Sequence, residues 1–152
     1  MASWAELQAS VPEFAAGVRG IFDKGRHKTM ATVRADGSPR ISGIEAEFVD
    51  GELTFGSMAG SNKGADLRRD PRLAIHSPSL DPPEDVPESW QGDAKITGKA
   101  VLTHEVTEGE APGPRFRVDI EEAVRVRVGE PADHLLIEVW RPDSGLRRIA
   151  RR

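Results

Sequence analysis

The sequence predicts a mainly β protein in which short antiparallel strands form a barrel with flanking helices. Two observations carry this prediction. Apolar and polar residues alternate along several short segments after residue 27, and the turns Asp36-Gly37 and Asp50-Gly51 separate the first three of these segments. The first 26 residues differ, because their apolar side chains recur at helical spacing.

The composition fits one domain over residues 1–152, with a helical segment at 1–26 and the barrel at 27–150. The formal net charge of -4 argues against a protein that coats nucleic acid. No segment is long and apolar enough to span a membrane, and no signal-peptide pattern is present. Cysteine is absent and the four histidines are scattered, so we expect no metal site. We therefore expect a cytoplasmic protein that binds neither nucleic acid nor a membrane.

The N-terminal region is predicted to form two helical pieces. Ser3 with Glu6, and Ser10 with Glu13, each match the pattern of a capping box. Pro12 fits the first turn of the second piece, where its missing N–H is tolerated. The apolar spacing indicates that these helices lie across the sheet or one end of the barrel.

Strand patterns and turn signals define the expected order of the remaining elements. Strands are expected at 29–35, 40–49, 52–57, around 73–75, at 93–104, and two or three more within 115–128 and 134–140; a short helix is expected at about 61–70. Residues 78–89 are rich in proline and acidic residues and are predicted to form an exposed loop. The basic C-terminal end is interpreted as a frayed, solvated terminus.

The loop after the third expected strand carries the clearest functional pattern. Ser61 or Asn62 can cap the following helix, and Lys63 lies in its first turn, where a cation is unfavourable unless an anion joins it. Gly60 lets the backbone come close to a ligand, and Ser57 ends a buried strand face. Hydroxyls, free N–H groups and one lysine at one point predict a phosphate site, although an ordinary turn with an exposed lysine is the alternative.

Four pieces of the sequence, in their order and spacing, extend this pattern. They are ATVRADGSP at 31–39, DGEL at 50–53, SNK at 61–63 and LRRDPRL at 67–73. Together they resemble the flavin-binding split-barrel family, which includes pyridoxamine-phosphate-oxidase-like proteins and the deazaflavin (F420) reductases. The resemblance covers residues 28–104 well and the remainder loosely. It implies a split β-barrel with an N-terminal helix and a short helix after the third strand.

The resemblance also implies where a cofactor binds. The ribityl phosphate of the cofactor would be held by the loop that contains Ser57, Gly60, Ser61, Asn62 and Lys63. The ring would lie along the second strand, at the residues Arg40, Ser42, Gly43 and Ile44. Gly43 interrupts the alternation and is interpreted as a β-bulge. The family's sites form across a homodimer, and Trp90 and Arg115 are further candidates.

The cofactor predicted from the resemblance is FMN or F420. F420 continues into an anionic glutamyl tail that requires extra basic groups, which Arg40, Arg68, Arg69 and Arg72 could supply; solvated surface arginines explain the same residues. The C-terminal segment 140–148 does not reproduce the substrate-binding Arg-Leu…Arg pattern of true pyridoxamine-phosphate oxidase, so vitamin B6 chemistry is not expected.

The predicted function is an oxidoreductase that transfers hydride between this cofactor and an unknown small molecule. No catalytic residue is identified. The first alternative is a non-catalytic carrier or sensor of flavin, F420 or haem on the same barrel. The second is a barrel without a ligand that serves as a dimeric interaction module.

Overall fold

The computed structural model describes all residues, 1–152, and confirms the mainly β fold. The helices are α1 (Trp4–Ser10), α2 (Pro12–Phe22), α3 (Asn62–Arg69) and a short 3-10 helix, η1 (Pro87–Ser89). The strands are β1 (His27–Val33), β2 (Pro39–Val49), β3 (Glu52–Gly56), β4 (Arg72–His76), β5 (Asp93–Val106), β6 (Gly113–Val128), β7 (Leu135–Arg141) and β8 (Gly145–Arg151). None of the helices has the length and apolar character needed to cross a membrane.

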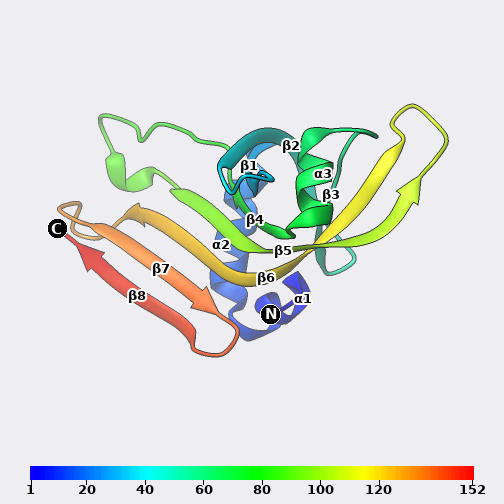
Figure 1. Cartoon of the computed structure of the whole chain (residues 1–152). Coiled ribbons are helices and arrows are strands. Elements are labelled where there is room, and N and C mark those ends of the chain that lie inside the picture. Colours follow the sequence, from blue (N-terminus) through cyan, green and yellow to red (C-terminus); the bar gives the residue numbers. More distant parts are fainter.

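Six of the strands close into a barrel. The order is β3-β2-β1-β4-β5-β6, and β3 also pairs with β6, with Gly56 opposite Arg115 and Phe55 opposite Phe116. Every pairing is antiparallel, and β5 and β6 extend beyond the barrel as a long hairpin (Figure 1). The closure places the start of β6 beside the end of β3, so a residue of the C-terminal half reaches the predicted phosphate loop.

The C-terminal end is a strand, and the prediction of a frayed terminus was wrong. β8 pairs along its full length with β7, from Gly145 opposite Arg141 to Arg151 opposite Leu135 (Figure 1). The hairpin extends the sheet beyond the barrel, with β8 at its edge. An edge strand commonly carries charged, exposed side chains that prevent pairing with other molecules, and such a strand resembles a solvated tail in the sequence.

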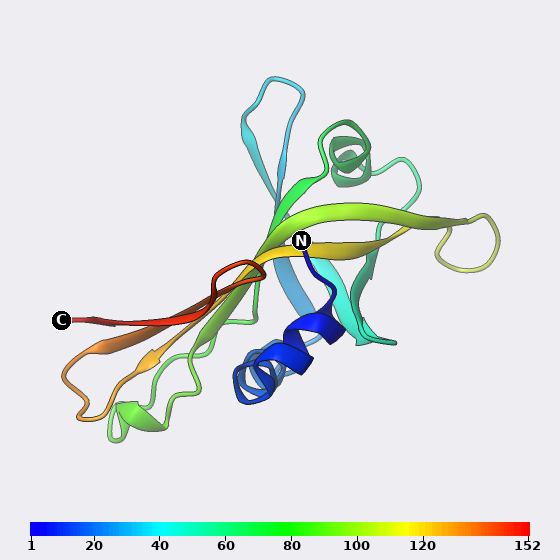
Figure 2. The ribbon, with the colours of Figure 1, turned by 90° about the horizontal axis from the view of Figure 1, so that it is seen from below.

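The N-terminal helices cover one side of β5 and β6, opposite the side on which α3 lies (Figure 2). Trp4 and Leu7 of α1 and Phe14 and Phe22 of α2 are buried in a core cluster of 24 residues. The capping box of Ser3 and Glu6 is confirmed. The predicted box of Ser10 and Glu13 was wrong, because the N-cap of α2 is residue 11, a valine, directly before the proline at the first helical position.

Candidate functional site

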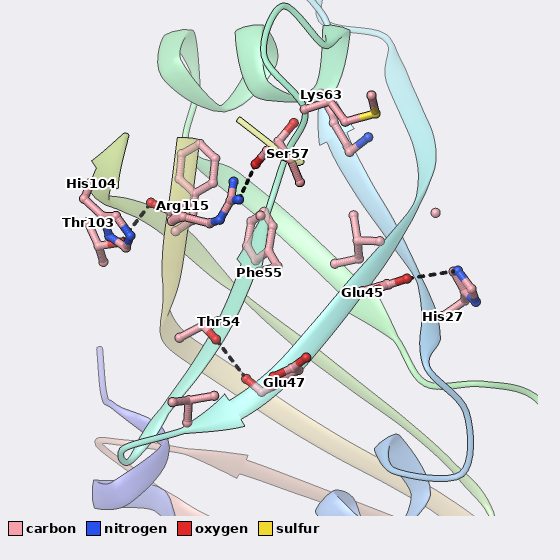
Figure 3. A pocket seen from close by; sticks show the side chains of 17 residues that line it. His27, Glu45, Glu47, Thr54, Phe55, Ser57, Lys63, Thr103, His104 and Arg115 are labelled. Atoms are coloured by element: carbon pink, nitrogen blue, oxygen red, sulfur yellow. Dashed lines mark hydrogen bonds and ion pairs between the residues drawn. The ribbon is translucent and has the colours of Figure 1, made fainter. Parts of the chain in front are cut away.

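An open groove of about 800 Å³ lies over β2 and β3, with α3 at one end (Figure 3). The residues that line it are His27, Gly43, Ile44, Glu45, Glu47, Val49, Thr54, Phe55, Gly56, Ser57, Met58, Lys63, Thr103, His104, Ala111, Arg115 and Phe116. Among the predicted cofactor-binding residues, the lining includes Gly43, Ile44, Ser57 and Lys63. A volume of this size is typical of a small-molecule site.

Strand β2 gives the groove its long wall through the alternation of its side chains. Ile44 and Ala46 are buried, whereas Gly43, Glu45 and Glu47 lie on the exposed face. Gly43 pairs in regular register with Thr29, so the predicted β-bulge at Gly43 was wrong. The space outside Gly43 is open, since a Cβ there would meet no atom within 4 Å. The glycine therefore leaves the strand backbone accessible without distorting it.

The loop between β3 and α3 gathers two serine hydroxyls at the end of the groove. Ser57 is 4% exposed, and its Oγ is hydrogen-bonded to Oγ of Ser61. Ser61 is the N-cap of α3, and its Oγ accepts a hydrogen bond of 3.1 Å from the N–H of Gly64. Gly60 has φ of +75°, a conformation that favours glycine. These contacts fix the loop, and they place Ser57 on the groove lining but leave Gly60 and Ser61 outside it.

Lys63 lies in the first turn of α3, as predicted, and lines the groove. No carboxylate oxygen lies within 4 Å of its ammonium group. The backbone N–H groups of Asn62 and Lys63 donate to no acceptor in the protein. Unpaired N–H groups and a lysine at a helix N-terminus favour an anion at this position.

Arg40 and Ser42 lie on the opposite face of β2 from Gly43 and do not line the groove. The Nε of Arg40 donates to Asp66 over 2.7 Å, and Thr32 and Arg69 donate to the same carboxylate. Burial raises the pKa of Asp66, but the hydrogen bonds from Arg40, Thr32 and Arg69 outweigh it and lower the pKa to about 2. Asp66 is therefore charged near neutral pH and fastens α3 to β1 and β2.

Of the other charged residues in the groove, only Arg115 was among the predicted candidates. Arg115 enters from β6 because β3 and β6 close the barrel, and no carboxylate oxygen lies within 4 Å of its guanidinium. On the β2 wall, Glu45 lies 3.5 Å from the Nε2 of His27, and Glu47 forms no ion pair (Figure 3). The groove thus has two unpaired cations at its α3 end and two carboxylates along β2.

Trp90, the other candidate from the C-terminal half, does not line the groove. Its Nε1 donates to the carbonyl oxygen of Leu80 over 2.8 Å, within the loop between β4 and β5. Arg115 was a candidate from the family resemblance, but its place beside the β3–α3 loop depends on the pairing of β3 with β6. Sequence alternation shows which face of a strand a side chain occupies, but it does not show which strands are neighbours.

The model of the pyridoxamine 5'-phosphate oxidase family matches residues 18–123. This segment runs from the second half of α2 to the middle of β6, and it includes the β3–α3 loop and Arg115. No protein with a curated description matches the sequence.

Several solved structures share the fold. A pyridoxamine 5'-phosphate oxidase-related, FMN-binding protein from Nostoc punctiforme has a TM-score of 0.64 at 12% identity, over 100% of this chain and 98% of its own. PhzG from Burkholderia lata, solved in complex with tetrahydrophenazine-1-carboxylic acid, has a TM-score of 0.62 at 12% identity, over 91% and 88%. An F420 reductase has a TM-score of 0.51 at 16% identity, over 70% and 95%.

Proposed function

Because the chain belongs to the pyridoxamine 5'-phosphate oxidase family, we propose that its groove binds a flavin-type cofactor, FMN or F420, and that the protein is an oxidoreductase. The observation that carries this proposal is the N-terminus of α3 at one end of a groove of about 800 Å³, where Lys63 has no carboxylate partner and the N–H groups of Asn62 and Lys63 are unpaired. When bound, such a cofactor supplies hydride transfer to or from a small-molecule substrate. The protein's part is to bind and orient it.

The residues at the α3 end fit a phosphate group. Lys63 supplies a positive charge, the N–H groups of Asn62 and Lys63 are free to donate, and the buried hydroxyl of Ser57 lies on the groove lining. A phosphate dianion is stabilised by this kind of combination of charge, helix N-terminus and hydroxyl. The ring of the cofactor would then lie along β2, where Gly43 leaves the strand backbone uncovered.

The choice between FMN and F420 is not decided by the arginines near α3. Each of the four considered for an anionic tail already pairs with a carboxylate: Arg40 and Arg69 with Asp66, Arg68 with Glu105 and Arg72 with Asp70. These arginines therefore give no reason to prefer F420 over FMN. Titration of the protein with both cofactors decides between them.

A non-catalytic carrier of flavin, F420 or haem remains the alternative function. Both functions use the same groove, so cofactor binding does not separate them. An oxidoreductase reoxidises its bound, reduced cofactor faster when a suitable acceptor molecule is added. A carrier shows the same reoxidation rate with every acceptor tested.

Replacing Lys63 with alanine is expected to weaken cofactor binding by about 1.5–3 kcal/mol, the contribution of a hydrogen bond to a charged group. Fluorescence titration of the cofactor measures this change. Lys24→Ala is the matched control, because Lys24 is exposed in the turn after α2 and does not line the groove. Unchanged affinity in Lys63→Ala would show that the phosphate lies elsewhere.

We also propose that two copies of the chain form a homodimer with the groove at their interface. Ile41 and Met58 are 75% and 74% exposed; Ile41 shares the outer face of β2 with Gly43, and Met58 lines the groove. Large apolar side chains exposed beside one groove are typical of a surface that a partner covers.

Light scattering is expected to give twice the 16.6 kDa mass of one chain. Ile41→Asp is expected to lower this mass towards that of one chain and to weaken cofactor binding. Leu80→Asp is the control, since Leu80 is also exposed but lies in the loop between β4 and β5. A monomeric wild-type protein that binds the cofactor fully would contradict the proposal.

A further inference from the structure

Arg115 is held at the groove by uncharged partners only. Its Nη1 donates to the carbonyl oxygens of Gly113 and Pro114 over 3.2 and 3.3 Å, and its Nη2 donates to that of Ala111 over 2.5 Å. The Nε–H has no acceptor in the protein. Carbonyl oxygens orient a guanidinium without neutralising it, and an arginine has five N–H donors. The charge of Arg115 and part of its donor set therefore remain available to a ligand.

The position of Arg115 depends on Gly56, its partner across the β3–β6 pair. A Cβ at Gly56 would lie 3.0 Å from Cδ of Arg115 and 3.1 Å from both its Nε and its Nη1. The arginine side chain therefore lies directly over the backbone of Gly56. This position brings the guanidinium next to Ser57, which follows Gly56 in the chain (Figure 3). Both lie at the end of the groove that Lys63 also lines.

The turn that orients Arg115 also holds the β3–α3 loop. The N–H of Ser57 donates to the carbonyl oxygen of Pro114 over 3.1 Å, and the N–H of Ala59 donates to that of Pro112 over 3.0 Å. Residues 111–114 thus bind the guanidinium through their carbonyl oxygens and bind the loop through two further hydrogen bonds. Arg115 and Ser57 are consequently fixed relative to each other before any ligand binds.

We propose that Arg115 is a second phosphate-binding residue, which holds the cofactor's phosphate from the β6 side while Lys63 holds it from the α3 side. This inference rests on the proposed function. Two cations match the two negative charges of a phosphate monoester such as that of FMN near neutral pH. A guanidinium that is already oriented loses little conformational freedom on binding, and its planar set of donors suits phosphate oxygens.

A purely structural role is the competing explanation, in which Arg115 only ties the 111–114 turn to β3. The two roles differ in a measurable way. A phosphate-binding residue discriminates between FMN and riboflavin, which share the ring and ribityl chain but differ in the phosphate. A structural residue affects the binding of both to the same extent. The chromophore of F420 lacks both the phosphate and the anionic tail, so the FMN pair is the one that isolates the phosphate.

The experiment is fluorescence titration of FMN and riboflavin, or of F420 and its chromophore, with the wild-type protein and three variants. Arg115→Met keeps much of the side chain over Gly56 and removes the charge, and Arg115→Lys keeps the charge and removes the planar donor set. Arg117→Ala is the matched control, because Arg117 lies two residues along β6, pairs with Asp119 and does not line the groove.

Arg115→Met is expected to reduce the preference for the phosphorylated cofactor about tenfold to a hundredfold. The affinity of Arg115→Met for riboflavin should stay that of wild type, and Arg117→Ala should keep the wild-type preference. The preference of Arg115→Lys should lie between those of wild type and Arg115→Met. An unchanged preference in Arg115→Met, or an equal loss for both ligands, overturns the role of Arg115 and leaves the proposed function standing. If wild type binds none of the four ligands, the proposed function fails and this inference fails with it.

Discussion

Replacing Glu138 with alanine is expected to lower the free energy of unfolding by about 3–5 kcal/mol, the cost of removing one partner from a buried ion pair. Glu138 is 1% exposed on β7. Its Oε1 accepts hydrogen bonds from Nη2 and Nε of Arg125 over 2.6 and 2.9 Å, and Arg127 and Arg148 each donate over 3.2 Å. Without the carboxylate, three guanidinium groups face one another, and Arg125 is largely buried.

Chemical denaturation monitored by circular dichroism measures this loss. Glu121→Ala is the matched control, because Glu121 is exposed on β6 and forms no ion pair, so its unfolding free energy should change by less than about 0.5 kcal/mol. A loss in Glu138→Ala no larger than in this control would show that the arginine cluster contributes nothing to stability. The cluster lies beyond residue 123, outside the segment that matches the family.

The stabilisation by Glu138 should also depend on pH. Burial raises the pKa of Glu138, but hydrogen bonds and charges from Arg125 and Arg127 outweigh it and hold the pKa below the ordinary 4.5. The folded state therefore binds the proton less tightly than the unfolded state. The contribution of Glu138 to stability is complete above its pKa in the unfolded state and is lost as the pH falls through its pKa in the folded state. The stability difference between wild type and Glu138→Gln should accordingly shrink in acid.

Gly113→Ala is expected to damage both the fold around the groove and cofactor binding. Gly113 has φ of +143°, and a Cβ there would lie 2.0 Å from the carbonyl oxygen of Ser57 and 2.7 Å from N of Ala59. These atoms are backbone and cannot rotate away, so the β3–α3 loop must move. Backbone strain alone costs about 1–3 kcal/mol. We expect cofactor affinity to fall by at least as much as in Lys63→Ala.

Gly109→Ala separates the steric clash from the backbone strain. Gly109 lies in the turn of the same hairpin with φ of +99°, but a Cβ there would meet no atom within 4 Å. The variant should lose some unfolding free energy and keep its cofactor affinity, as measured by denaturation and by fluorescence titration. Equal cofactor affinity in Gly113→Ala and Gly109→Ala would contradict the role assigned to the 111–114 turn.

Much of the fold could be predicted from local sequence, because its signals are local. The turns at Asp36-Gly37 and Asp50-Gly51 and the alternation after residue 27 identify the first strands. The predicted position of Lys63 in the first turn of α3 is confirmed, since Ser61 is the N-cap. The second capping box was wrong because Pro12 follows α1 too closely for Ser10 to serve as the N-cap of α2.

The site was only partly predictable, because it depends on contacts between distant segments. Gly43, Ile44, Ser57 and Lys63 line the groove. Arg40 does not, since its guanidinium binds Asp66, a pairing that alternation along β2 cannot indicate. Arg115 of β6 lies in the groove because β3 pairs with β6, and this pairing depends on the packing of the whole barrel.

Fluorescence titration of the purified wild-type protein with FMN and with F420, each beside its phosphate-free counterpart, tests the central claim most directly. An absorbance spectrum taken first identifies any cofactor that co-purifies. We expect at least one phosphorylated cofactor to bind, and to bind more tightly than the same chromophore without its phosphate. If neither cofactor binds, or if the phosphate makes no difference to affinity, the groove between α3, β2 and β6 is not the phosphate-anchored flavin site proposed for it.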